Sequence, residues 1–328
     1  MRNLITDVAG ITVGCADDPR LASGVTVALF DEPAVASVSV SGGAPAGRDL
    51  ECLAPDARID KVDAILFSGG SGFGLDAASG AQAFLRERGR GYAIGGALVP
   101  LVPQAICFDL LNGGNKDWGR YPPYREIAYA ACELAGADFT LGTAGAGFGA
   151  TTVNLKGGQG SVSARTPSGH VVGAVAIVNA IGSAVIGDGP HFWAAPFEQG
   201  DEFGGLGSPQ HLGENDRKLA YKGAAQFATT IAMVATDAVL TKVQANRLAT
   251  AAHDGLARAI NPAHTMSDGD TLFALATGRV PLEGDAPGMT VLSALAAEVV
   301  ARATLRAVRA ARSVRTAEAH FPCAADLD

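Results

Sequence analysis

The stretch Phe227-Ala-Thr-Thr-Ile-Ala-Met-Val-Ala-Thr-Asp237 has the apolar, β-branched composition of a buried strand, and two adjacent hydroxyl groups stand at its start. Thr229 and Thr230 fit ordinary strand positions, because threonine is common in β-sheets. Thr229 is nevertheless the best candidate nucleophile of the chain, since it follows the small residue Ala228 and opens the strand. A threonine nucleophile needs a base and hydrogen-bond donors for a developing oxyanion.

The composition indicates one tightly packed domain over residues 1–328, because 48% of the residues are apolar, 18% are charged and 42 are glycine. The formal net charge is −8, and the sequence contains no run of lysine or arginine. Such a chain lacks the electrostatic attraction that DNA, RNA and anionic membranes require. Neither nucleic acid nor a membrane is therefore expected as a partner.

The cysteines and the N-terminus favour a cytoplasmic protein. The N-terminal residues contain no apolar core after a basic start, so no signal peptide is predicted. Charged residues interrupt the apolar segment 291–311, which predicts a helix that does not cross a membrane. The cysteines lack the spacing of a disulfide framework or a zinc site and suit a reducing compartment: Cys15, Cys52, Cys107, Cys132 and Cys323.

Apolar periodicity predicts strands and helices along the whole chain. β-branched runs bounded by turn residues predict strands at 4–13, 24–40, 62–67, 99–109, 171–186, 227–237 and 272–277. Helical periodicity predicts helices at 77–88, 124–134, 241–260 and 288–312, with Thr241 as an N-cap. Residues 187–226 show little periodicity, and so long an irregular segment is typically functional or a linker.

The glycine-dense segments do not predict a nucleotide site. Gly70, Gly72 and Gly74 follow a predicted strand at a spacing of two, which does not satisfy G-x-G-x-x-G. The glycine-rich segment that leads to Lys156 lacks the Walker pattern G-x-x-x-x-G-K-[ST]. Close backbone packing is the better explanation of these glycines, and no organic cofactor is expected.

Two polar residues lie in unusually apolar or glycine-rich surroundings. Lys156, between Leu155 and two glycines, is either a solvated hairpin lysine or a partly buried base or charge stabiliser with a lowered pKa. Asn179 is the lone amide within the apolar run 171–186. Since a buried amide without partners costs about 1–3 kcal/mol, Asn179 lies either at a strand end or bulge, or points into a site.

Asp268 and Asp270 place two carboxylates on either side of Gly269, just before the predicted strand at 272–277. Such a pair suits acid–base chemistry or calcium binding. The EF-hand spacing is absent and only two ligands are local, so no metal is expected. The nearby His264 fits best as a structural histidine.

Several segments, in this order along almost the whole chain, resemble the DmpA-like aminopeptidases, a family that includes L-aminopeptidase/D-amidase enzymes, β-peptidyl aminopeptidases and the nylon-oligomer hydrolase. The matching segments are Ile5-Thr-Asp-Val-Ala-Gly-Ile, Phe67-Ser-Gly-Gly-Ser-Gly-Phe-Gly-Leu-Asp-Ala-Ala78, Val99-Pro-Leu-Val-Pro, Gly145-Ala-Gly-Phe-Gly-Ala-Thr, Leu155-Lys-Gly-Gly-Gln-Gly, Thr229-Thr-Ile-Ala-Met-Val-Ala-Thr-Asp-Ala238 and Asp268-Gly-Asp-Thr-Leu-Phe-Ala274.

The resemblance implies an α+β fold, a four-layer αββα sandwich of the DmpA/ornithine-acetyltransferase type. It also implies a precursor that cuts itself between Ala228 and Thr229, giving chains 1–228 and 229–328, with Thr229 as the new N-terminal nucleophile. Family positions match Asn179, Lys156, Asp268 and Asp270. Ala228 stands where relatives carry Gly or Asn, and Val153 and Asn154 stand where some carry a catalytic Tyr or Lys.

The function implied is an aminopeptidase or amidase that hydrolyses short peptides or ω-amino-acid amides through an acyl-enzyme on Thr229, without metal or cofactor. Asn179 would donate to the oxyanion, Lys156 would stabilise charge, and the carboxylates would orient Thr229 or meet a substrate amine. Relatives assemble as homo-oligomers of cleaved pairs. The alternatives are an acyltransferase of the ornithine-acetyltransferase type and a non-processing ligand-binding relative.

Overall fold

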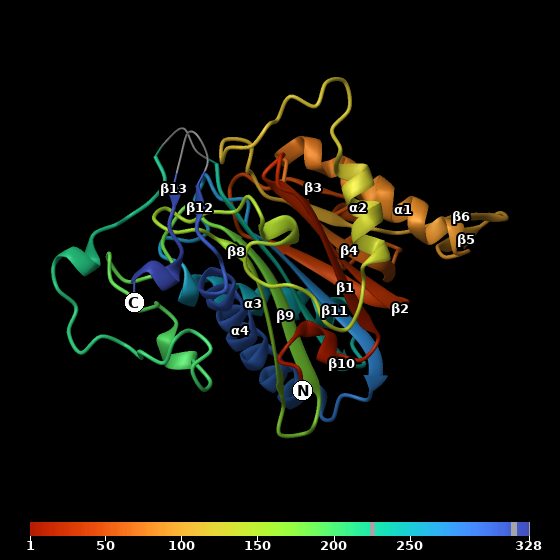
Figure 1. Cartoon of the computed structure of the whole chain (residues 1–328). Coiled ribbons are helices and arrows are strands. Elements are labelled where there is room, and N and C mark those ends of the chain that lie inside the picture. Colours follow the sequence, from red (N-terminus) through yellow and green to blue (C-terminus); the bar gives the residue numbers. More distant parts are fainter. Residues whose placement is uncertain (224–226, 316–319, 328) are drawn as a thin grey trace.

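One large mixed β-sheet organises the computed structural model, which describes residues 1–223, 227–315 and 320–327 (Figure 1). Within these residues its strand order is β3-β7-β4-β2-β11-β10-β9-β8, with β1 paired to β2. The strands of the sheet are β1 (Ile11–Asp18), β2 (Ser23–Val40), β3 (Gly47–Arg48), β4 (Lys61–Ser68), β7 (Gln104–Ile106), β8 (Gly158–Arg165), β9 (Val171–Asn179), β10 (Thr229–Ala238) and β11 (Thr271–Val280). Two separate two-stranded sheets pair β5 (Tyr92–Ile94) with β6 (Ala97–Val99) and β12 (Val314–Arg315) with β13 (His320–Phe321).

The four predicted helices are present, with ends within three residues of the predicted ones. They are α1 (Ala77–Glu87), α2 (Tyr124–Glu133), α3 (Lys242–Ala259) and α4 (Asp285–Arg309). The predicted N-cap is confirmed, because the Thr241 hydroxyl accepts the N–H of Gln244 at 3.2 Å and the Gln244 side chain accepts the N–H of Thr241 at 2.8 Å. No helix of the described ranges has both the length and the apolar character that a membrane span requires.

The long strand β2 belongs to two layers of the fold. Its first part pairs antiparallel with β1 and β4, and residues 35–40 pair antiparallel with β11. Between Leu29 and Ala34 the register against β4 shifts, and the exposed Pro33 lies in this irregular segment. Since proline cannot donate to a ladder, it is tolerated at such an interruption, where the strand can bend from one layer into the other.

Alternate residues of each strand face different layers, so every central strand contributes to two cores. In β10, Met233 points into the core between the sheet layers, whereas Val234 packs against α3 and α4. In β4, Phe67 faces the same central core, and Leu66 packs against α1 and α2. Figure 1 shows the two helix pairs on opposite outer faces. The architecture is the αββα sandwich, and the predicted α+β fold is confirmed.

Three predicted strands are shorter than expected. At the N-terminus, the Asp7 carboxylate accepts the N–H groups of Arg2 and Asn3 at 2.9 Å, which turns residues 5–7 into a 3₁₀ helix, and β1 begins only at Ile11. The predicted strand at 99–109 is reduced to Gln104–Ile106 and the end of β6, because its two prolines cannot donate backbone hydrogen bonds. The run at 171–186 ends as a strand at Asn179.

Residues 187–226 were predicted to be irregular, and the described part of this segment agrees with that prediction. Residues 187–223 form loops with two short 3₁₀ turns, Ala195–Phe197 and Asn215–Arg217, and residues 224–226 lie outside the described residues. In Figure 1 this segment makes a long excursion away from the sheet, beyond α4. It returns to the sheet at the start of β10.

The central core between the layers offers a direct test of the sandwich. Phe273 is fully buried there, and its ring lies 5.9 Å from that of Phe67. Phe273→Ala should lower the free energy of unfolding by about 3–5 kcal/mol, because it removes buried area and leaves a cavity. Urea unfolding followed by circular dichroism measures the loss. Val243→Ala, at a position 63% exposed on α3, is the control, and an equal loss in both variants would contradict this packing.

Candidate active site

Thr229 lies at the start of the central strand β10, between β9 and β11. It pairs with Asn179, the last residue of β9, in the antiparallel register. On the other side, Ala228 forms a parallel bridge with Asp268, which precedes β11. Thr229 is 4% exposed. The sheet therefore brings together three positions that are widely separated in the sequence.

The peptide bond before Thr229 is held by backbone hydrogen bonds. The N–H of Ala228 donates to Ser267 O at 3.0 Å, and the Ala228 carbonyl oxygen accepts the N–H of Gly269 at 2.9 Å. The Thr229 hydroxyl donates to the same carbonyl oxygen at 2.6 Å. Because one oxygen accepts both bonds, the hydroxyl lies beside a carbonyl group that Gly269 already polarises.

The sequence left open whether Asn179 ends a strand or points into a site, and the structure shows both features. Asn179 ends β9 and is fully buried. Its Oδ1 accepts the N–H of Thr151 at 3.0 Å, and its Nδ2 donates to Phe108 O at 2.8 Å. An amide group has two N–H donors, so Nδ2 keeps one hydrogen beyond the bond to Phe108.

Lys156 is buried, so the solvated-hairpin alternative is wrong. Its side chain is 1% exposed, and Nζ donates to Ala150 O at 2.6 Å, Gly157 O at 2.9 Å and Gly147 O at 3.1 Å. Burial lowers the pKa of Lys156 to about 7, against the ordinary 10.5. Because three carbonyl oxygens surround its Nζ, Lys156 holds together the loop that carries Thr151, and it acts on Asn179 through that loop.

A second buried lysine, Lys222, was missed by the sequence reasoning. Lys222 is 8% exposed, and its Nζ donates to Thr151 O at 2.9 Å and to Asn179 Oδ1 at 3.4 Å. Burial lowers the pKa of Lys222 to about 7 as well. Its surroundings in the sequence are polar and glycine-rich, and no local pattern distinguishes it from the exposed Lys218.

The two carboxylates fix the backbone around Thr229. Asp268 accepts the N–H of Ile181 at 3.2 Å and both the N–H and the hydroxyl of Thr265, at 3.0 and 2.8 Å. Asp270 accepts the N–H of Thr230 at 2.8 Å. Burial, together with the charge of Asp270, raises the pKa of Asp268. Of the two roles considered for the pair, the geometry favours orienting the start of β10.

His264 is tied to the same carboxylate. The Asp270 Oδ2 lies 2.7 Å from His264 Nδ1 and accepts the His264 N–H at 3.0 Å. Burial opposes the charged imidazolium, but the bond to Asp270 outweighs it, so the pKa of His264 is raised. His264 also has φ of +57°, a conformation that costs energy for a side-chain-bearing residue. These two bonds to Asp270 hold the strained backbone in place.

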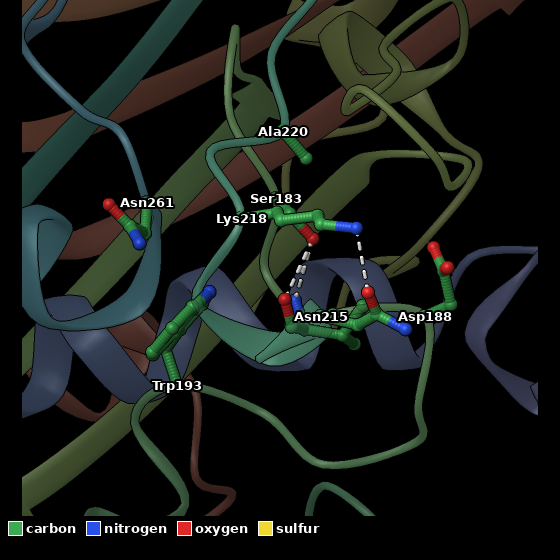
Figure 2. A pocket seen from close by; sticks show the side chains of 9 residues that line it. Ser183, Asp188, Trp193, Asn215, Lys218, Ala220 and Asn261 are labelled. Carbon is green, nitrogen blue, oxygen red and sulfur yellow. Dashed lines mark hydrogen bonds between the residues drawn. The ribbon is translucent and has the colours of Figure 1, made fainter. Parts of the chain in front are cut away.

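A pocket of about 400 Å³ lies beside residues 183–187, which follow β9 in the chain (Figure 2). Its wall includes Ser183, which exchanges two backbone hydrogen bonds of 3.0 Å with Asn261. The irregular segment supplies the opposite wall, including Trp193 and two residues of opposite charge, Asp188 and Lys218. The Lys218 ammonium donates to Asn215 at 2.8 Å. The pocket is close to the site because Ser183 follows Ile181, which binds Asp268, by only two residues.

Comparison with known proteins settles the family. A family model described as Peptidase family S58 matches residues 3–321. The chain belongs to peptidase family S58. The resemblance to DmpA-like aminopeptidases is thereby confirmed, and the S58 protein is a hydrolase of amide or peptide bonds.

Relatives and solved structures agree with this assignment. The chain is 42% identical over 341 residues to an uncharacterized aminopeptidase of Mycobacterium tuberculosis, covering 95% of each chain. It is 29% identical to a 6-aminohexanoate-oligomer endohydrolase of Paenarthrobacter ureafaciens, covering 92% of this chain and 84% of that one. A Burkholderia sp. beta-aminopeptidase superposes with a TM-score of 0.74 at 23% identity, covering 100% of this chain and 92% of that one. The L-aminopeptidase D-Ala-esterase/amidase of Ochrobactrum anthropi superposes with a TM-score of 0.69 at 21% identity, covering 95% of this chain and 87% of that one.

Gly269 is expected to be irreplaceable. A Cβ atom there would lie 2.8 Å from Ala44 O and 2.8 Å from Thr229 Oγ1. Gly269→Ala should therefore displace the hydroxyl and lower amide hydrolysis by about 10²-fold or more, measured as release of p-nitroaniline from amino-acid anilides. The control is Gly72→Ala, since a Cβ atom at the exposed Gly72 meets nothing within 4 Å. Equal activity of the two variants would contradict the crowding at Gly269.

The buried Lys156 should make stability depend on pH. Between about pH 7 and 10.5 the unfolded chain keeps the Lys156 proton that the folded protein has lost, so the free energy of unfolding rises with pH. Lys156→Met lacks this contribution. The difference in the free energy of unfolding between wild type and variant should grow by about 1 kcal/mol per pH unit from pH 7.5 to 9, measured by urea titration. For Lys61→Met, at an exposed position, the difference in unfolding free energy from wild type should not change with pH. A pH-independent difference for Lys156→Met as well would contradict the lowered pKa.

Proposed function

We propose that the S58 protein is a self-processing N-terminal-nucleophile aminopeptidase or amidase. In this proposal residues 1–328 fold as one domain and are cut once between Ala228 and Thr229, giving chains 1–228 and 229–328. The observation that carries the proposal is the 2.6 Å hydrogen bond from the Thr229 hydroxyl to the Ala228 carbonyl oxygen. The same oxygen also accepts the N–H of Gly269.

The first reaction is an intramolecular attack. Thr229 Oγ1 adds to the carbonyl carbon of Ala228, and negative charge develops on the carbonyl oxygen, where the Gly269 N–H stabilises it. The bond from this carbon to the Thr229 nitrogen breaks, and the hydroxyl proton goes to that nitrogen. The Thr229 amine is now free and an ester joins Ala228 to Oγ1; hydrolysis of this ester by water releases the Ala228 carboxylate and restores the Thr229 hydroxyl.

The second reaction uses the amine that the first one creates. An α-amine has an ordinary pKa of about 7.7–8.0, so it can accept the hydroxyl proton when Thr229 attacks a substrate amide near neutral pH. The departure of Ala228 would free the Gly269 N–H, and Asn179, which pairs with Thr229 from β9, keeps one Nδ2 hydrogen. These two donors would hold the oxyanion of the substrate, while Lys156 supports the loop behind Asn179 and Asp268 and Asp270 orient the strand.

The proposed substrates are short peptides or ω-amino-acid amides. The adjacent pocket is small and has Asp188 and Lys218 on its wall, which suits a short substrate with a charged end. The names of relatives, an aminopeptidase and a 6-aminohexanoate-oligomer endohydrolase, agree with peptides and ω-amino-acid amides as substrate classes. We further propose a homo-oligomer of cleaved pairs, as the family resemblance implies, and a cytoplasmic location, as the N-terminal residues and the cysteines favour.

Intact-mass measurement of the purified protein tests the cleavage. Wild type should give two chains, residues 1–228 and 229–328, and release p-nitroaniline from amino-acid anilides. Thr229→Ala should remain a single chain without activity, because it has no hydroxyl to attack. Thr229→Ser should restore cleavage.

The adjacent hydroxyl provides the matched control. Thr230→Ala removes a hydroxyl from the next position of the same strand and should still be cut after residue 228. Persistence of full-length wild-type protein would refute self-processing. Addition of an acceptor amine to the assay distinguishes hydrolysis from acyl transfer, since a transferase would form the amide of that amine.

A further inference from the structure

Lys222 is buried in a segment that is otherwise exposed. Within residues 211–223, all of which the structure describes, it is the one buried residue, whereas the nearby Leu219 and Tyr221 are 62% and 56% exposed. Apolar packing alone would bury Leu219 and Tyr221 and leave Lys222 exposed, because lysine is rarely buried unless it is paired. Desolvating an ammonium group is costly, so specific polar contacts must compensate for the burial of Lys222.

One of those contacts is with the Thr151 carbonyl oxygen, and the other is with the amide of Asn179. Oδ1 of Asn179 accepts both the Lys222 ammonium at 3.4 Å and the N–H of Thr151 at 3.0 Å. A rotation of the amide by 180° would turn its NH₂ group toward two donors, so Lys222 and Thr151 together fix the orientation of Asn179. In that orientation Nδ2 donates to Phe108 O at 2.8 Å and keeps one hydrogen.

The anchoring of Lys222 does not depend on the bond before Thr229. The Lys222 N–H donates to Ile181 O at 2.9 Å, and the Ile181 N–H donates to Asp268 at 3.2 Å. The ammonium also donates to Thr151 O at 2.9 Å. All of these partners lie outside residues 223–229, so a cut after Ala228 removes none of them.

We propose that Lys222 is a positioning residue that holds the Asn179 amide in the orientation needed for its Nδ2 to donate to the oxyanion, and that it stays in the site after cleavage near the end of chain 1–228. This inference rests on the proposed function and deepens it. The irregular segment thereby contributes a residue to the active site as well as a wall to the pocket.

Steady-state kinetics of Lys222→Met, with Lys61→Met at an exposed position as the control, tests the role. Lys222→Met should lower kcat about 10- to 100-fold, leave KM within about threefold, and slow the cleavage of newly made protein by a similar factor. Lys222→Gln keeps a hydrogen-bond donor without the charge and should fall between Met and wild type. Lys61→Met should match wild type. A Lys222→Met enzyme within twofold of the control in kcat and cleavage rate overturns the proposal.

Trimming of the mature wild-type protein tests the anchoring without any variant. A nonspecific carboxypeptidase should remove residues from the end of chain 1–228 and stop before Lys222, with activity retained, because that residue is buried. Removal of Lys222 with unchanged activity overturns the proposal. A wild-type chain that never cleaves refutes the proposed function itself, whereas normal cleavage with a fully active Lys222→Met refutes only the role of Lys222.

Discussion

The backbone pairing between residues 228 and 268 is the constraint on which the rest of the site depends. Ala228 donates to Ser267 and accepts from Gly269, so the peptide bond before Thr229 is fixed as firmly as a bond within the sheet. Because the sheet fixes this bond, the Thr229 hydroxyl and its neighbouring carbonyl face each other without a flexible loop between them. The sandwich supplies the rigidity: β10 is central, and its two faces pack into different cores.

Buried polar groups surround this backbone, and several of them make hydrogen bonds that position a neighbour. Lys156 binds three carbonyls of its own loop, Asp270 holds Thr230 and His264, and Lys222 binds Asn179. Removal from water lowers the pKa of both lysines to about 7. The network therefore combines rigid geometry with charges that can change near neutral pH, which is a frequent property of active sites.

The sequence predicted the elements and the strand-borne candidates well, because both follow from local periodicity. Helix positions, the Thr241 cap and the start of β10 all depend on neighbours within a few residues. Predictions were wrong where a specific hydrogen bond overrides composition, as at Asp7, whose carboxylate turns residues 5–7 away from a strand. Lys222 was not predicted, since its burial depends on partners 43 and 71 residues away in the chain, Asn179 and Thr151. No local pattern carries that information.

Because β10 lies in the centre of the sheet, a chain break just before it would place a chain terminus inside the sheet. The strand is hydrogen-bonded to β9 on one side and to β11 on the other, so the sheet holds residue 229 in register whether or not residue 228 is attached. Chain termini are normally the most mobile parts of a protein. A terminus created here would be as immobile as a core side chain, and two polypeptides would share one sheet without a dissociable interface. Covalent continuity at this point would matter for folding and become dispensable for the finished molecule.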